Sequence, residues 1–188
     1  MTLAVLLLAW LSGGLHLDGV ADTADACGAR SREDALRIMK GSTIGTYGSL
    51  ALISVLGLKI AGLSALPPPT LAPALLAMPV LGRWAHAQMT AGRPYARAEG
   101  TAKSFVAGAS RTDYALATAI ALPAVAVALG SAGLIAAAAI WGAVALYARW
   151  VTRWLGGVTG DTIGAAGEGA EVIAVLTWAA VFHIRGAA

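Results

Sequence analysis

The sequence predicts an all-α protein, a polytopic integral membrane helical bundle of about 5–7 apolar helices. Hydrophobic residues make up 58% of the 188 residues, charged residues make up only 12%, and the mean hydropathy is +0.73. Soluble domains carry about a quarter charged residues, so this chain cannot cover itself with a polar surface. No charged residue occurs from Tyr114 to Ala148. That run is longer than the roughly 20 apolar residues that one membrane crossing needs.

The first half of the chain predicts three apolar helices. Residues 3–15 are apolar but too short for a full crossing, so we expect them to be the rear half of a helix whose front precedes this start. Residues 44–66 and 71–86 form the next pair. The proline run at 67–69 gives the turn between them, because proline cannot continue a helix.

The second half of the chain predicts a helical hairpin and a final span. Residues 112–129 and 134–150 are the two arms of the hairpin, and the sequence Gly-Ser-Ala-Gly lies at the turn between them. Residues 172–182 form the last apolar segment. Ala and Gly dominate these spans, and small residues let membrane helices pack closely. The same composition favours contact with membrane lipid and self-association into a homo-oligomer.

Three polar segments carry most of the basic residues. Loops rich in Lys and Arg prefer the cytoplasm, and an even number of crossings separates each of these segments from the next. All three are therefore expected to be cytoplasmic, within one membrane-embedded domain over residues 1–188. The formal net charge of +3 is mild and gives no reason to expect nucleic acid as a partner. In chain order, the basic residues of these three segments are Arg30, Arg32, Arg37 and Lys40; Arg83, Arg93, Arg97, Lys103 and Arg111; and Arg149 and Arg153.

Eight of the ten acidic residues lie in two short clusters beside apolar stretches. Carboxylates near membrane depth are expensive to desolvate, so they persist mainly where they have a function. In a helix, Asp18, Asp22 and Asp25 stand at positions i, i+4 and i+7 and share one face. They repel one another unless a cation neutralises them, and hard oxygen ligands favour Mg²⁺, Mn²⁺ or Ca²⁺. The alternative is a solvated, acid-rich helix turn stabilised by the macrodipole.

Residues that flank the first cluster have two interpretations each. His16 is either a general base or phosphate-orienting residue, or a helix-end histidine without a catalytic role. Arg37 and Lys40 follow a helix start at Ser31, and they either form an anion clamp or serve as surface charges. The glycines between residues 41 and 48 suit close helix packing, or a phosphate that rests on backbone amides at a helix start.

The second cluster leads directly into the last apolar segment. Asp161 and Glu168 share one face if this region is helical, and Glu171 lies one turn beyond Glu168. Each glycine in this region lowers helix propensity by about 1 kcal/mol relative to Ala, so tight packing or a ligand would have to hold the helix. Both clusters place Asp-Thr near a glycine at a polar-to-apolar boundary. We therefore expect the two clusters to face one site.

A set of motifs runs in order through nearly the whole chain. These motifs are Gly14-Leu15-His16-Leu17-Asp18-Gly19-Val20-Ala21-Asp22-Thr23-Ala24-Asp25, Arg30-Ser31-Arg32, Met39-Lys40-Gly41-Ser42, Gly45-Thr46-Tyr47-Gly48, Arg83-Trp84, Tyr95-Ala96-Arg97-Ala98-Glu99-Gly100 and Gly157-Val158-Thr159-Gly160-Asp161-Thr162-Ile163-Gly164-Ala165. The set resembles the cobalamin synthase family, also called adenosylcobinamide-GDP ribazoletransferase. Members of that family usually carry a longer segment before the first motif, so we expect the N-terminus to be truncated relative to the family.

The resemblance implies an enzyme of the cell inner membrane that acts late in corrinoid biosynthesis. It implies transfer of the adenosylcobinamide-phosphate moiety of adenosylcobinamide-GDP to α-ribazole, or to its 5′-phosphate, with release of GMP. Mg²⁺ is the implied cofactor, and a metal held by carboxylates neutralises the negative charge that develops as GMP leaves.

The site residues follow from combining the resemblance with the acidic clusters. Asp18, Asp22 and Asp25 are expected to bind Mg²⁺, with Asp161 completing the site. The positive side chains are expected to hold the substrate pyrophosphate. A carboxylate, for which we choose Asp22, or His16 takes the proton from the ribazole hydroxyl. The substrate-binding residues are Arg37, Lys40 and Arg97.

Two other functions fit parts of the pattern. Enzymes that transfer CDP-alcohols to make phospholipids also use clustered Asp on membrane helices, but their motif continues with two further Asp after a basic residue. Here Gly28-Ala29-Arg30 has no such continuation. Intramembrane acids also mark the ion paths of cation transporters. Against a transporter, the acids cluster at the ends of spans.

Overall fold

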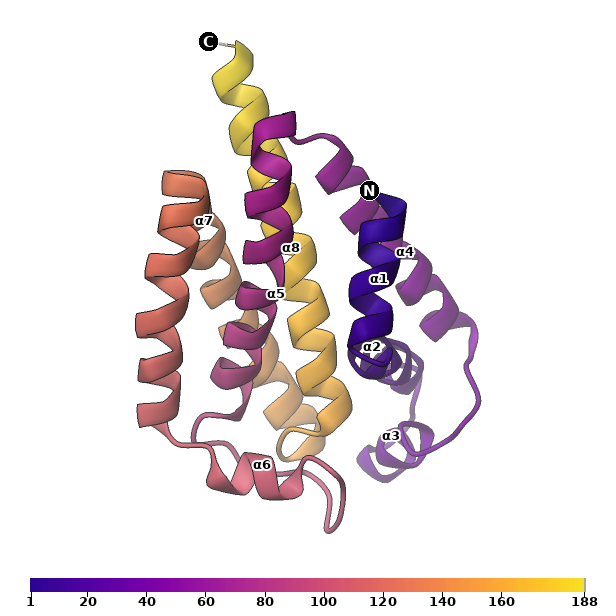
Figure 1. Ribbon diagram of the computed structural model, residues 1–188. Coiled ribbons are helices and arrows are strands. Elements are labelled where there is room, and N and C mark those ends of the chain that lie inside the picture. The colour runs from indigo at the N-terminus through magenta and orange to yellow at the C-terminus, as the bar shows by residue number, and fades with distance from the viewer. Residues whose placement is uncertain (188) are drawn as a thin grey trace.

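The computed structural model describes residues 1–187, and these residues form a bundle of eight α-helices (Figure 1). In that described part, the β-structure is a single isolated bridge between Tyr95 and Val158. The all-α class predicted from composition is therefore confirmed. The helices are α1 (Thr2–Leu11), α2 (Leu15–Ala26), α3 (Arg32–Ile38), α4 (Thr46–Ser64), α5 (Pro68–Thr90), α6 (Lys103–Gly108), α7 (Arg111–Leu155) and α8 (Gly160–Ala187).

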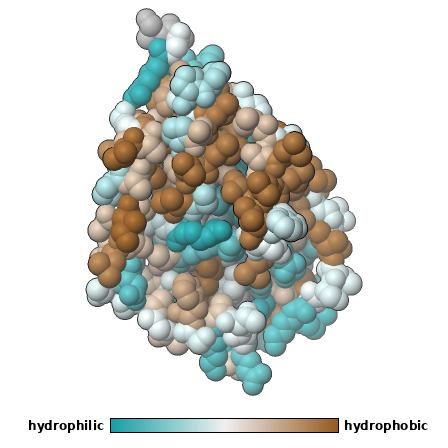
Figure 2. Space-filling view, viewed as in Figure 1, coloured by the Kyte–Doolittle hydropathy of each residue, from teal (hydrophilic) through white to brown (hydrophobic). Residues whose placement is uncertain are grey.

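The long helices lie side by side, and the polar connections gather at one end of the bundle. Figure 1 shows α3, α6 and the start of α8 at the lower end, whereas the turn from α4 to α5 lies at the upper end. Figure 2 shows hydrophobic residues over much of the visible face, with hydrophilic residues at the end that carries α3 and α6. Helices α3 and α6 and the start of α8 thus share one end of the bundle, and the prediction that this end is cytoplasmic stays a prediction.

Three of the described helices, α4, α7 and α8, are long and apolar enough to cross a membrane. A fourth crossing results if α1 and α2 are counted as one span, although they are bent by 91° at the break between them. The prediction of 5–7 apolar helices is therefore approximate. The predicted number is higher because the two arms of α7 were counted as separate helices and α5 was counted as an apolar helix.

Helix α7 contains the predicted hairpin. Its backbone leaves the helical region at Gly130, where φ is 58° and ψ is −137°, and the two arms run antiparallel from that point (Figure 1). A Cβ atom added at Gly133 would lie 2.3 Å from the carbonyl oxygen of Val125. A glycine is needed there because the backbones of the two arms approach so closely.

Three helix boundaries differ from the sequence-based expectation. Pro68 begins α5, so the proline run starts a helix instead of forming the whole turn; the first helical turn has no need of the N–H that proline lacks. The N-terminal apolar segment, predicted to run to residue 15, forms α1 only as far as Leu11. Gly13 and Gly14, both with positive φ, then turn the chain into α2. Helix α8 starts at Gly160, well before the apolar segment at 172–182, because its glycines pack against neighbouring helices.

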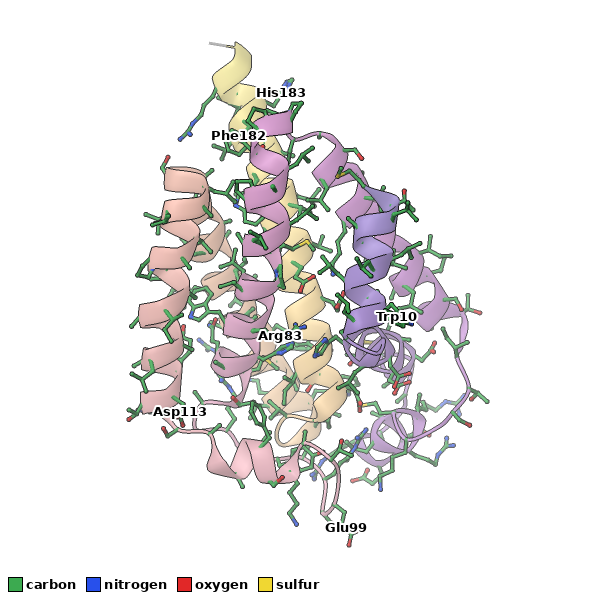
Figure 3. The ribbon with its side chains drawn as sticks, viewed as in Figure 1. Trp10, Arg83, Glu99, Asp113, Phe182 and His183 are labelled. Atoms are coloured by element: carbon green, nitrogen blue, oxygen red, sulfur yellow. The ribbon has the colours of Figure 1, made fainter. Side chains whose placement is uncertain are left out.

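A buried group of charged side chains joins α4, α5 and α8 in the interior. Lys59 donates hydrogen bonds of 2.6 Å to Glu168 and to Glu171, and all three residues are buried. Arg83 lies 3.8 Å from Glu171, and its side chain is 48% exposed. Figure 3 shows Arg83 about midway along the bundle, where Figure 2 has a hydrophilic patch among hydrophobic residues. Two cations thus balance two carboxylates.

Enlarging the small residue between the arms of α7 should destabilise the bundle. Gly133→Ala is expected to lower the free energy of unfolding by about 1–3 kcal/mol, because the added methyl group meets a backbone carbonyl. Gly142→Ala, in the same helix, is the matched control, since nothing lies within 4 Å of a Cβ atom there. Thermal unfolding of the detergent-purified variants measures the difference. Equal midpoints for the two variants would contradict the close approach.

Replacing the buried Lys59 should lower the free energy of unfolding more than Gly133→Ala does. Lys59→Met is expected to lower the free energy of unfolding by about 3–5 kcal/mol, because Glu168 and Glu171 lose their buried partner. The triple variant Lys59→Met, Glu168→Gln, Glu171→Gln should recover a large part of that loss, because no buried carboxylate remains. The same unfolding measurement tests both variants. A triple variant less stable than Lys59→Met would contradict this account.

Candidate active site

The acidic face of α2 lines an open pocket at the polar end of the bundle. Asp18 and Asp22 are one helical turn apart, and both border a pocket of about 370 Å³. The other walls come from the loop at residues 41–44 and from α4. Asp18 is exposed and Asp22 is half-buried. The spacing predicted from the sequence therefore places two carboxylates at one accessible pocket.

Helix α8 brings a third carboxylate to this face. A Cβ atom at Gly19 would lie 2.6 Å from the carbonyl oxygen of Asp161, and one at Gly164 would lie 3.1 Å from Cα of His16. These two glycines let α2 and α8 pack closely. The carboxylate of Asp22 consequently experiences the negative charges of Asp18 and Asp161. The two acidic clusters therefore approach each other where α2 packs against α8, whereas their joint role at one metal ion stays a prediction.

A short backbone bridge places a positive charge beside Asp161. Ala96 N–H donates to the Val158 carbonyl at 2.9 Å, and Val158 N–H donates to the Pro94 carbonyl at 2.9 Å. The loop after α5 is thereby joined to the loop before α8. Arg97, two residues after Tyr95 of this bridge, donates a 2.6 Å hydrogen bond to Oδ2 of Asp161. Arg97, chosen from the sequence as a substrate-binding residue, thus lies at the acidic site.

Asp25 has a different environment from the other acids of α2. Its carboxylate accepts hydrogen bonds from the backbone N–H groups of Gly45 at 2.7 Å and Gly48 at 2.8 Å, at the start of α4. A Cβ atom at either glycine would lie within 2.5 Å of the carboxylate. The glycine spacing therefore serves close packing against Asp25. These two amides are occupied and are not available to a phosphate.

The donor chemistry at this pocket fits a hard divalent cation. Asp18 and Asp22 in its wall, and Asp161 across the contact of α2 with α8, offer carboxylate oxygens, the ligands that Mg²⁺ prefers. Within residues 1–187, however, no group of three or more His, Cys, Asp or Glu side chains is already arranged to hold a metal ion. Asp161 pairs with Arg97 through Oδ2, which leaves Oδ1 as the oxygen that could join such a site. These residues are of the type that binds Mg²⁺, but the three carboxylates would have to move closer together to bind one ion.

Arg37 and Lys40 lie at the rim of this end of the bundle, in and just after α3. The predicted helix start is confirmed, because the Ser31 hydroxyl accepts a hydrogen bond from Asp34 N–H at 3.1 Å. Arg37 is 75% exposed and donates to Asp34, and this hydrogen bond holds the pKa of the Asp34 carboxyl below its ordinary value. Lys40 is also exposed. Both side chains are free to reorient toward an anion.

His16 points into the bundle interior, away from the open pocket. Its ring lies against that of His86 in α5, with centroids 4.7 Å apart, and its charged neighbours include Glu168 and Lys59. Nδ1 of His16 and Nε2 of His86 are buried without a hydrogen-bond partner from the described residues. Neither His86 nor Lys59 is among the site residues predicted from the sequence. The sequence feature that could have indicated the buried group of Lys59, Glu168 and Glu171 is the presence of a single lysine, Lys59, in the apolar segment 44–66.

Comparison with known proteins identifies the relatives of this chain. The family described as "Cobalamin-5-phosphate synthase" matches residues 1–179. A protein named "Adenosylcobinamide-GDP ribazoletransferase" from Roseiflexus sp. (strain RS-1) is 46% identical over 92% of this chain. Proteins of the same name from Leptothrix cholodnii and Herpetosiphon aurantiacus are 42% and 44% identical, over 91% and 94% of the chain.

The match covers part of each relative's length. The aligned region spans 65% of the Roseiflexus protein, 69% of the Leptothrix protein and 72% of the Herpetosiphon protein. No solved structure matches the chain. The profile match over most of the chain and the identities of 42% to 46% agree with the motifs at both acidic clusters. The chain belongs to the cobalamin-5-phosphate synthase family.

Proposed function

We propose that this protein transfers the adenosylcobinamide-phosphate moiety of adenosylcobinamide-GDP to α-ribazole or its 5′-phosphate and releases GMP. The observation that carries the proposal is the meeting of Asp18, Asp22 and Asp161 with Arg97 at the polar end of a membrane bundle. The names of the family and of its relatives point to the same reaction. Phosphoryl transfer needs mainly positioning and electrostatic stabilisation, which clustered charges supply.

The reaction forms one bond to phosphorus and breaks another. The ribazole hydroxyl oxygen bonds to the phosphorus that carries the corrinoid, and the bond from that phosphorus to the bridging pyrophosphate oxygen breaks. The bridging oxygen leaves with GMP. Asp22 takes the hydroxyl proton, because it is the half-buried carboxylate that borders the pocket. His16, the other base predicted from the sequence, faces the interior.

Three basic residues are proposed to hold the pyrophosphate. Arg97 already lies beside Asp161, so its guanidinium can donate to a phosphate oxygen that arrives there. Arg37 and Lys40 would reach the pyrophosphate from the exposed rim. A planar guanidinium binds phosphate through paired hydrogen bonds, whereas the Lys40 ammonium acts as a point charge.

Magnesium is proposed as the cofactor, held by Asp18, Asp22 and Asp161. When bound, it would neutralise charge on the pyrophosphate and the leaving GMP. Asp25, also predicted as a ligand, contributes by binding the start of α4 and so supporting the pocket wall. Its direct coordination of the metal stays a prediction.

The protein is proposed to lie in the cell inner membrane with its polar end in the cytoplasm. The basic residues of α3 and of the loops near α6 support this orientation through the preference of Lys and Arg for the cytoplasmic side. Exposed apolar side chains such as Leu76, Ile120 and Val127 would contact lipid. Exposed small residues on the spans would also permit a homo-oligomer.

The transfer reaction itself can be tested with membranes that contain this protein. Incubation with adenosylcobinamide-GDP, α-ribazole and Mg²⁺ should release GMP and form a corrinoid product that chromatography detects. Asp22→Asn and Asp161→Asn should each lower the rate by at least about 100-fold, because each removes a charge at the reacting phosphate. Glu33→Gln, an exposed carboxylate of α3, is the matched control. Near-normal GMP release from Asp22→Asn would overturn the assignment of this site.

Metal removal should abolish transfer reversibly. Treatment with EDTA is expected to stop GMP release, and added Mg²⁺ should restore it, because phosphoryl transfer needs its charge neutralised. Asp18→Asn should raise the Mg²⁺ concentration needed for half-maximal activity by about tenfold, since one of the proposed ligands is lost. Glu33→Gln should leave that concentration unchanged. Full activity in EDTA would contradict the metal proposal.

A further inference from the structure

The side chain of Arg32 joins three parts of the chain at the polar end of the bundle. Its Nε donates a 2.7 Å hydrogen bond to the Leu155 carbonyl, and its Nη2 donates to the Ala96 carbonyl at 3.3 Å. These two carbonyls lie 123 and 64 positions away along the chain. One planar guanidinium therefore connects the first residue of α3 to the end of α7 and to the loop after α5.

The end of α7 is shaped to receive this guanidinium. Gly156 caps the helix with a φ of 74°, a left-handed conformation that favours glycine. A Cβ atom at Gly156 would lie 3.3 Å from Cζ of Arg32, so the guanidinium packs where a side chain would otherwise project. The last carbonyls of a helix have no partner within the helix and carry partial negative charge. Arg32 supplies both a hydrogen bond and a positive charge to this helix end.

The Ala96 carbonyl belongs to the residue that directly precedes Arg97. The N–H of Ala96 donates to the Val158 carbonyl, and its own carbonyl accepts from Arg32, so the backbone of this residue is held from two sides. Arg97 then extends to Asp161, to which it donates a hydrogen bond. Arg32 thus helps to fix the backbone from which Arg97 reaches the proposed reaction site.

The helix that Arg32 begins carries the other two proposed phosphate-binding cations. Arg37 lies in α3, and Lys40 follows the last residue of α3 by two positions. This helix has seven residues and is too short to be stable alone, so contacts with the rest of the bundle set its position. At its far end Met39 is buried, and its sulfur accepts a 3.9 Å hydrogen bond from Thr159. At its start, Arg32 makes the charged contact.

We propose, on the basis of the proposed function, that Arg32 is a positioning residue for the transfer reaction. Its two hydrogen bonds hold two chain segments at a fixed separation, with Arg97 on one segment and Arg37 and Lys40 on the other. Loss of these hydrogen bonds leaves the three cations in the sequence but changes the distances between them. The pyrophosphate is then bound in the wrong place relative to the acceptor hydroxyl, and an error of about 1 Å in placement can lower a rate by about 100-fold.

Direct binding of phosphate is the competing role for Arg32, because this residue is exposed and a guanidinium has several donors. Two observations favour positioning. The donors of Arg32 that form hydrogen bonds point to backbone carbonyls of α7 and of the loop after α5. The walls of the acidic pocket come from residues 14–22, residues 41–44 and α4, whereas Arg32 lies at the opposite end of α3 from residues 41–44.

Steady-state kinetics of the full chain in lipid nanodiscs tests the positioning role. Arg32→Lys keeps the positive charge but lacks the planar pair of donors. It should raise the KM for adenosylcobinamide-GDP about tenfold and leave the KM for α-ribazole unchanged. Arg30→Lys is the matched control, because Arg30 is exposed and its hydrogen bond to Asp34 comes from the backbone N–H. It should keep both KM values of the wild type. Wild-type KM values in Arg32→Lys would overturn the inference.

A double variant separates positioning from direct phosphate binding. In an Arg97→Ala background, Arg32→Lys should raise the KM for adenosylcobinamide-GDP by less than about threefold, because a cation that Arg32 positions is already lost. The same tenfold factor in both backgrounds would mean that Arg32 acts independently of Arg97, and it would overturn the positioning role.

A distance measurement tests the same inference without any substrate. Cys27 is the only cysteine, so Cys27→Ser provides a background for spin labels at Glu33→Cys in α3 and Glu99→Cys in the loop after α5. Both positions are exposed, and Figure 3 shows Glu99 at the polar end of the bundle. Arg32→Lys should broaden the distribution of distances between the labels, whereas Arg30→Lys should leave it unchanged.

The distance measurement also separates this inference from the proposed function. An unchanged distribution in Arg32→Lys would overturn the inference even if the wild type transfers normally. A wild-type protein that releases no GMP with both substrates would overturn the proposed function, while the distribution still reports whether Arg32 fixes the two segments.

Discussion

The contact between α2 and α8 is the constraint on which the rest of the site depends. Gly19 faces the backbone of Asp161, and Gly164 faces the backbone of His16, so each helix presents a glycine where the other approaches. A side chain at either position would separate the helices by the thickness of a methyl group or more. The third carboxylate would then leave the face of Asp18 and Asp22. Small residues here position charge as well as pack helices.

Bringing carboxylates together creates repulsion that the structure offsets in two ways. At the open pocket, Arg97 neutralises Asp161, and the bridge between Tyr95 and Val158 holds it there. In the interior, Lys59 lies between Glu168 and Glu171. Lys59, Glu168 and Glu171 are paired and buried, whereas Asp18 and Asp22 form no salt bridge with any residue that the structure describes. This difference separates a buried ionic network, which stabilises the fold, from the accessible carboxylates of the proposed reaction site.

Much of the architecture could be predicted from hydropathy and helical periodicity. The uncharged run after Tyr114 predicted the hairpin of α7, and the spacing of Asp18 and Asp22 predicted their shared face. The start of α8 could not be predicted from the apolar pattern. Its glycines lower helix propensity, and packing against neighbouring helices stabilises the helix there. The pairing of Lys59 with Glu168 and Glu171 was missed for a related reason. It joins residues more than 100 positions apart, and no local pattern encodes that distance.

The bridge between Tyr95 and Val158 has a mechanical consequence. It makes the loop after α5 and the loop before α8 a single body, because each supplies a backbone hydrogen bond to the other. A movement of one loop is therefore transmitted to its neighbour, and Arg97 and Asp161 travel with it. Rotation of the Arg97 side chain is the change that separates the guanidinium from the carboxylate while both backbone hydrogen bonds of the bridge stay intact.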